Sequence, residues 1–165
     1  MGTNSFLIGL FLTILCASCH RERQWTQSQI VSTKKTSCSS KLIHTAIDPI
    51  YGLAFELVKT QEGIKGYLVA HSTPLSKRSV SQYTPIKYII DKEIFTSEGY
   101  VLEGGQKILL NETLIQDLIC ALHLEKKIEI SLTGYKTQLD GKGFPQAFQK
   151  FQTPPNYQNP FHLPF

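Results

Sequence analysis

Hydrophobic and polar residues alternate in several short stretches of the chain, and glycines separate many of these stretches. Residues 128–132 alternate most cleanly, and residues 53–59 and 66–71 form a pair of such stretches around Gly63. An apolar residue at every second position is typical of a strand with one buried face, and a glycine turn between two strands favours a hairpin. Further short strands are predicted at 86–90, 93–96, 100–103, 106–110 and 135–139. Their close spacing indicates an antiparallel meander.

Two segments have helical periodicity instead. Asn111 can cap a helix that runs to about residue 124, and its apolar positions fall on one face: Leu114, Ile115, Leu118, Ile119 and Leu122. A shorter helix is predicted at about 144–151, with Phe144, Phe148 and Phe151 on one side. The predicted fold class is therefore α+β: a small antiparallel sheet with one main helix and a short C-terminal helix, in a compact domain spanning residues 46–151.

The N-terminus carries an uncharged apolar run of about ten residues, 6–15. A membrane-spanning helix needs about 20 apolar residues, so this run is too short to cross a bilayer comfortably. A short apolar run at the extreme N-terminus that ends in small residues is typical of a signal peptide. Residues 1–18 are predicted to be one and are left out of the fold.

The residues that end this run are Leu15, Cys16, Ala17, Ser18 and Cys19. They resemble the lipobox of bacterial lipoproteins, although Cys16 stands where an aliphatic residue is usual. The resemblance covers only residues 1–19. It implies cleavage before Cys19 and a diacylglycerol on its thiol, and the following residue, His20 in place of Asp, implies passage to the outer membrane.

Two other interpretations of the N-terminus stay open. Residues 1–5 contain no Lys or Arg, whereas Arg21 and Arg23 follow the apolar run. This distribution is opposite to that of ordinary export and fits a short anchor that leaves the domain in the cytoplasm. The second is a secreted protein that carries no lipid, which is intermediate between the lipidated form and the short anchor.

The net charge of +4 is concentrated between His20 and Thr45, because residues 46–151 contain equal numbers of basic and acidic residues. A neutral domain is a poor partner for nucleic acid, since phosphate neutralisation supplies most of that affinity. Residues 19–45 show no sustained periodicity and are predicted to be a flexible tether. Its candidate contacts with anionic head groups are Arg21, Arg23, Lys34 and Lys35; alternatively these charges only keep the tether solvated.

Cys38 and Cys120 remain if Cys19 is acylated. An even pair in an oxidising compartment can form one disulfide between the tether and the main helix. The alternative is that they are unrelated thiols, with Cys120 a small buried hydrophobic residue.

No nucleophile-elbow or phosphate-loop motif occurs in the chain. The five His residues lack the short spacing of a zinc site, so no metal or cofactor is predicted. A small hydrolase that uses His71 or His44 with a nucleophile and a carboxylate is the enzyme alternative, and it depends on geometry that the sequence does not give.

The C-terminal residues 152–165 are rich in proline and aromatic residues. Such a tail can dock in a partner's groove as an extended segment, and more often it is disordered or lies over its own sheet. Before it, Gly143, Phe144, Ala147 and Phe148 resemble, over fewer than ten residues, the closing segment of small periplasmic β-proteins of the invasion-associated locus B type.

These features together predict a lipid-anchored bacterial cell-envelope protein with a binding or structural role, facing the periplasm or the cell surface. Its predicted partners are membrane lipid, through acylated Cys19, and an envelope protein. An interaction module that acts through the C-terminal tail is a further alternative.

Overall fold

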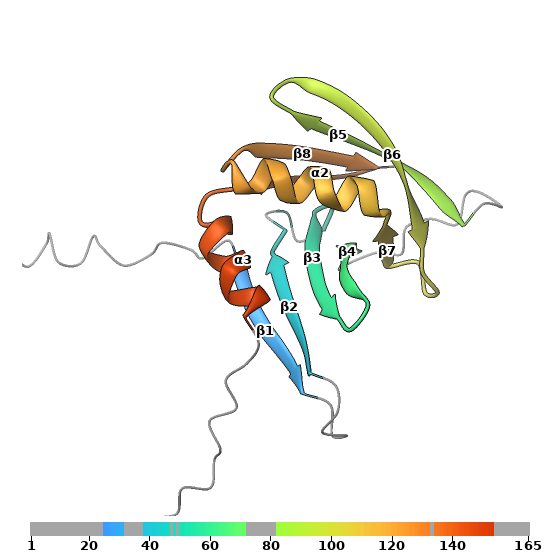
Figure 1. Ribbon diagram of the computed structural model, residues 1–165. Coiled ribbons are helices and arrows are strands. Elements are labelled where there is room, and N and C mark those ends of the chain that lie inside the picture. The colour runs from blue at the N-terminus through green and yellow to red at the C-terminus, as the bar shows by residue number, and fades with distance from the viewer. Residues whose placement is uncertain are drawn as a thin grey trace, which may run out of the picture.

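The computed structural model describes residues 25–31, 38–46, 48, 50–71, 82–132 and 134–153, with only the backbone of 29–31 and 38. Within these residues the chain forms one nine-stranded antiparallel sheet and two helices (Figure 1). The elements are β1 (Trp25–Val31), β2 (Cys38–His44), β3 (Leu53–Thr60), β4 (Gly63–Ala70), β5 (Tyr83–Ile90), β6 (Glu93–Val101), β7 (Lys107–Leu110), α2 (Glu112–His123), β8 (Lys127–Leu132), β9 (Tyr135–Asp140) and α3 (Phe144–Gln152).

The antiparallel sheet and both predicted helices are confirmed, but the protein is β-rich and not a balanced α+β fold. The strand order is β1-β2-β3-β4-β7-β6-β5-β8-β9, so β7 inserts beside β4 and the strands β5 to β7 run backwards through the sheet. This order is not a simple meander. The two short strands predicted at 93–96 and 100–103 are one continuous strand, β6, that reaches Val101.

The flexible tether predicted for residues 19–45 is wrong in its described part, because β1 and β2 lie there and form one end of the sheet. The predicted domain start at 46 is therefore too late. The inner side chains of β2 are Ser40, Leu42 and His44, all buried. Two of these three are polar, and this hides the alternation that normally marks a half-buried strand.

Both helices pack on one face of the sheet, called here the inner face, which carries Leu42, Phe55, Leu68, Ile108 and Ile130. Helix α2 contacts β4 and β8, and α3 contacts β1 and β2. Figure 1 shows α3 beside the β1–β2 end and α2 crossing the middle of the molecule. The outer face, on the opposite side, carries no described helix.

The predicted helix details agree with the structure. The Asn111 Oδ1 atom accepts a hydrogen bond of 2.8 Å from the Leu114 backbone N–H, and this caps α2. Four of the five predicted apolar positions of α2 are buried, and Ile119 is partly buried. All three phenylalanines of α3 are buried as well.

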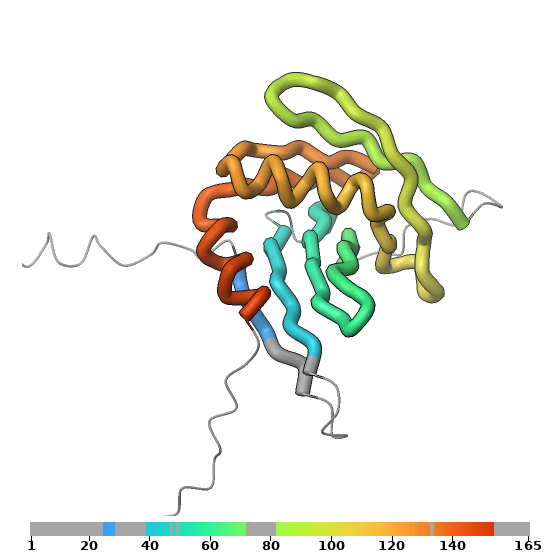
Figure 2. The backbone as a smooth tube through the Cα atoms, viewed as in Figure 1, coloured from blue at the N-terminus to red at the C-terminus, as the bar shows by residue number. Residues whose placement is uncertain are grey.

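The two ends of the strand order meet at one corner. The indole Nε1–H of Trp25 in β1 donates a 2.8 Å hydrogen bond to the Asp140 carbonyl oxygen at the end of β9. The Lys136 backbone N–H of β9 also donates to the Tyr51 carbonyl oxygen, just before β3, at 3.3 Å. The sheet is thus bent until β9 approaches β1 and β3, while the β5–β6 hairpin extends away from this corner (Figure 2).

Candidate functional site

An open groove of about 580 Å³ lies where β5, β6, the β8–β9 turn and the segment before β3 come together. Its lining combines basic, hydroxyl, aromatic and apolar groups: Asp48, Tyr51, Pro85, Ile86, Lys87, Thr96, Ser131, Leu132, Gly134, Tyr135 and Lys136. Ligand sites in proteins typically have volumes of about 300–1,000 Å³. The groove is the candidate functional site of the described chain.

Four lining residues form one row across four neighbouring strands. Lys87 of β5 pairs with Thr96 of β6 on one side and with Ser131 of β8 on the other. Ser131 in turn pairs with Lys136 of β9. Because paired residues in antiparallel strands project from the same face, these four side chains share the outer face of the sheet. The row places two ammonium groups and two hydroxyl groups beside one another.

A tight loop before β3 forms one wall of the groove. Asp48 Oδ1 accepts hydrogen bonds from the backbone N–H groups of Ile50, at 2.7 Å, and Tyr51, at 3.0 Å. These bonds, with the larger effect from Tyr51, lower the pKa of the Asp48 carboxyl below its usual value. The Tyr51 side chain is 61% exposed although its carbonyl oxygen is bonded to β9, so its ring is presented to solvent.

Gly52 closes this loop by donating its backbone N–H to the Asp48 carbonyl oxygen at 3.0 Å. A Cβ atom at this position would lie 2.2 Å from that same oxygen. Only glycine therefore allows the loop to approach itself this closely, and Gly52 sets the position of the Asp48 and Tyr51 wall.

The groove has an unbalanced charge. Lys87 and Lys136 make no ion pair with any described residue, whereas four other lysines of the described chain do. The carboxylate in the lining is Asp48, whose Oδ1 atom is already bonded to the backbone. Two cations and one carboxylate give the site a local excess of positive charge.

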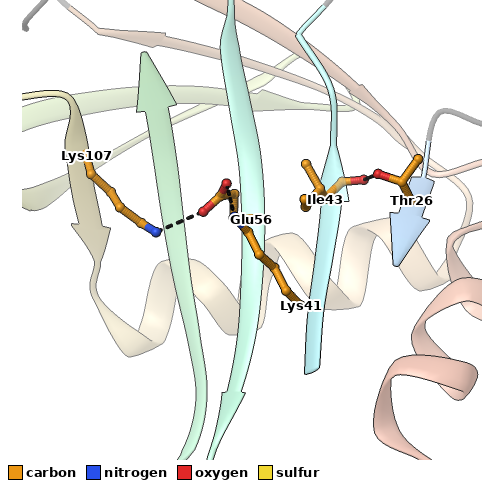
Figure 3. Close-up of polar contacts among 5 residues, drawn as sticks. All are labelled: Thr26, Lys41, Ile43, Glu56 and Lys107. Atoms are coloured by element: carbon orange, nitrogen blue, oxygen red, sulfur yellow. Dashed lines mark hydrogen bonds and ion pairs between the residues drawn. The ribbon is translucent and has the colours of Figure 1, made fainter. Parts of the chain in front are cut away.

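A second polar cluster lies elsewhere on the outer face, around Glu56 of β3 (Figure 3). Glu56 is only 5% exposed, and its two oxygens contact the ammonium groups of Lys41, at 2.5 Å, and Lys107, at 2.9 Å. Lys107 also lies 4.2 Å from the centre of the Tyr67 ring. Burial raises the pKa of Glu56, but the hydrogen bonds and charges of the two lysines outweigh burial and leave this pKa below its usual value. Each charged group of this cluster has a partner within the chain, so its role is to join β2, β3 and β7.

His44, a candidate of the hydrolase alternative, is 1% exposed on the inner face of β2. Its ring contacts Trp25 edge-on, with centroids 4.8 Å apart, and neither ring nitrogen has a hydrogen-bond partner among the described residues. Burial lowers the pKa of His44 to about 4, and the negative charge of Asp140 raises it only in part. The ring is therefore neutral at pH 7 and packed in the core, and no described nucleophile lies within hydrogen-bonding distance.

His71, the other candidate, is exposed and directly follows β4. The structure does not bring it to His44 or into the groove lining. Among the described residues no cluster of His, Cys, Asp and Glu is arranged to hold a metal ion.

Cys120 is exposed on α2, so the interpretation of a buried small hydrophobic residue is wrong, and its thiol is bonded to no other described side chain. The side chain of Cys38 is outside the described ones, and the disulfide stays a prediction. Cys19, Arg21, Arg23, Lys34 and Lys35 lie outside the described residues, as do residues 154–165 of the tail. Gln152, predicted to begin that tail, is the last residue of α3. Within the described ranges no helix is long and apolar enough to span a membrane.

Comparison with known proteins gives no match to a family model, to a curated protein or to a solved structure. The groove was not predicted from the sequence. The alternation around residues 86–88 marks Lys87 as outward-facing, but only the strand register shows that it is a neighbour of Ser131 and, beyond it, Lys136.

Proposed function

We propose that this chain is a lipid-anchored bacterial envelope protein whose sheet domain binds a ligand at the groove beside Lys87. The anchor rests on the sequence: a short apolar run, two small residues and then Cys19. The binding role rests on the groove, where hydroxyl groups, an exposed aromatic ring and two ammonium groups without an ion pair to any described residue come together.

The start of β1 gives the anchor a geometric consequence. Cys19 and Trp25 are separated by residues 20–24. A fully extended chain spans at most about 3.6 Å per residue, so Trp25 lies within about 22 Å of an acylated Cys19. An anchored domain would therefore stay close to the membrane surface, with little freedom to reach distant partners.

The anchor is tested by the intact mass of the mature protein extracted from bacterial membranes. We expect a chain that begins at Cys19 and carries a diacylglycerol, and we expect the Cys19→Ala variant to lose this lipid. Cys16→Ala is the matched control, because it removes the other leader cysteine and should leave processing and mass unchanged. A mature protein that retains Met1, or that is lipidated equally in the Cys19→Ala variant, contradicts the anchor.

A further inference from the structure

We infer that the ligand of the groove is an acidic saccharide, with its carboxylate held by Lys87 and Lys136 and a sugar ring lying on Tyr51. This inference rests on the proposed binding role of the groove and is independent of the lipid anchor. Four observations carry it: the spacing of the lysines, the hydroxyl groups between and beside them, an Asp48 oxygen that accepts no hydrogen bond from a described residue, and the exposed aromatic wall.

The two lysines are placed to share one anionic group. Ser131 lies between them in the register, so Lys87 and Lys136 are two strands apart. Neighbouring strands are about 4.8 Å apart, which puts the two backbones about 10 Å from each other. The two long side chains, projecting from one face, can both reach a carboxylate above Ser131. Because no described acid neutralises either ammonium, an external carboxylate would meet an unpaired positive charge.

The remaining polar groups suit a ligand that is rich in hydroxyl groups. Thr96 and Ser131 offer hydroxyls that both donate and accept hydrogen bonds. Asp48 Oδ1 accepts two backbone N–H groups, whereas no hydrogen bond to Asp48 Oδ2 is present among the described residues, which leaves it as an acceptor for a ligand O–H. A polyanion without hydroxyl groups would offer this carboxylate only repulsion. A saccharide with hydroxyl groups and a carboxylate on each ring can place one carboxylate at the lysines and a hydroxyl donor at Asp48, and so satisfies both parts of the site.

The apolar part of the site fits a sugar ring. Tyr51 is 61% exposed, and its backbone is fixed by hydrogen bonds to Asp48 and Lys136. Pro85 adds a second exposed apolar surface in the lining. A tyrosine ring offers a flat apolar face together with a polar hydroxyl, and this combination matches the C–H face and hydroxyl rim of a sugar. The open shape of the groove fits a segment of an oligosaccharide better than an enclosed small molecule.

The inference is tested by titrating the full mature protein with three probes of equal length: an oligogalacturonate hexamer, the neutral maltohexaose and hexaglutamate. Binding is measured by calorimetry, and its location by amide chemical shifts. We expect the uronate hexamer to bind at least tenfold more tightly than either other probe, with shifts at Tyr51 and Ser131, and to weaken several-fold between 50 and 200 mM salt.

Variants then assign the contacts. Lys87→Gln and Lys136→Gln should each weaken uronate binding about five- to tenfold, and Tyr51→Ala should weaken uronate binding while it leaves the salt dependence unchanged. Lys127→Gln is the matched control. Lys127 of β8 is exposed, as the two groove lysines are, but it lies outside the groove lining. This variant should bind the uronate hexamer as the parent protein does. Unchanged unfolding midpoints show that these surface changes leave the fold intact.

If hexaglutamate binds as tightly as the uronate hexamer, or if Lys127→Gln weakens uronate binding as much as the groove variants do, the acidic saccharide is overturned as the ligand. Binding would then be a general effect of charge. Tight binding with shifts away from Tyr51 and Ser131 overturns the groove itself, and with it the proposed binding role. No binding of the uronate hexamer overturns the acidic saccharide alone, because the groove remains open to a ligand of another class and the anchor is judged separately by mass.

Discussion

Two groups of lysines on the outer face of the sheet differ in whether a carboxylate lies between them. Across β2, β3 and β7, Lys41 and Lys107 both contact the buried carboxylate of Glu56. Across β5, β8 and β9, Lys87 and Lys136 flank Ser131 with no carboxylate between them. In the first group, called here the Glu56 half, the register pairs Lys41 with Val58 and Lys107 with Val69, and both side chains reach across to Glu56. In the second, called the groove half, the register itself places the two lysines beside Ser131, and no acid stands between them. Charges satisfied within the chain stabilise the fold, whereas charges left unsatisfied at a concave surface are available to a ligand.

The largest expected effect on stability comes from His44, which is buried on the inner face of β2, in the Glu56 half. Its pKa of about 4 lies below the value of about 6.5 in an unfolded chain. A lowered pKa in the folded state means that the stability contributed by neutral His44 is fully present above pH 6.5. It is lost as the pH falls toward 4, because the unfolded chain takes up the proton first. We expect a loss of about 3 kcal/mol in the free energy of unfolding over this window.

Denaturant unfolding measured between pH 7 and pH 4 checks this expectation. His44→Phe should remove most of the slope between pH 6.5 and pH 5, a range above the titration of Glu56. The same slope in the parent and in His44→Phe would show that another group is responsible.

The second largest effect is expected when the ion pairs of Glu56 are removed. Glu56→Gln removes the shared acid and leaves Lys41 and Lys107 near one another without a counter-charge. Breaking a fully buried pair costs about 3–5 kcal/mol, and because both lysines are partly exposed we expect a loss of about 2 kcal/mol. The lowered pKa of Glu56 means that its contribution is present above its unfolded pKa and is lost as the pH falls through the lower folded value. Glu129→Gln, an exposed acid on the outer face of β8, is the control and should be nearly neutral in denaturant unfolding.

A smaller effect is expected at the wall of the groove. Gly52→Ala places a methyl group against the Asp48 carbonyl oxygen and forces the loop to move. We expect a loss of about 1 kcal/mol in stability, at the lower end for added methyl groups because the loop can shift. Uronate binding should weaken together with it, since Asp48 and Tyr51 move. Gly63→Ala is a poor control, because alanine would be strained at the Gly63 φ of 131°. Gln61→Ala in the β3–β4 turn serves better.

The smallest effect sharpens the comparison between the two halves. Lys87→Gln should change the free energy of unfolding by less than about 0.5 kcal/mol, because the ammonium has no partner in the described chain. Lys107→Gln should cost about 1 kcal/mol, since it removes a partly buried ion pair. Thermal and denaturant unfolding of the two variants side by side give the contrast. Equal losses would mean that Lys87 also has a structural role.

The sequence predicted the elements whose apolar residues follow one period. The helix begun by Asn111, the phenylalanine face of residues 144–151 and the alternating strand around Ile130 all belong to this group. It failed at β1 and β2, where Ser40 and His44 are polar residues turned inward. It also missed the order of strands, because the insertion of β7 beside β4 depends on long-range packing. The groove depends on that order, so no local pattern could reveal it.

Trp25 has a mechanical consequence for the domain. It is the first described residue of the sheet, and it is held at once by His44 across β2, by the Asp140 carbonyl oxygen of β9 and by the Phe144 ring of α3. A force applied from the amino-terminal side would act on this residue before any other described residue. Separating β1 from β2 would also require the Trp25 indole to lose its contacts with β9 and α3. One side chain therefore joins the two ends of the described fold.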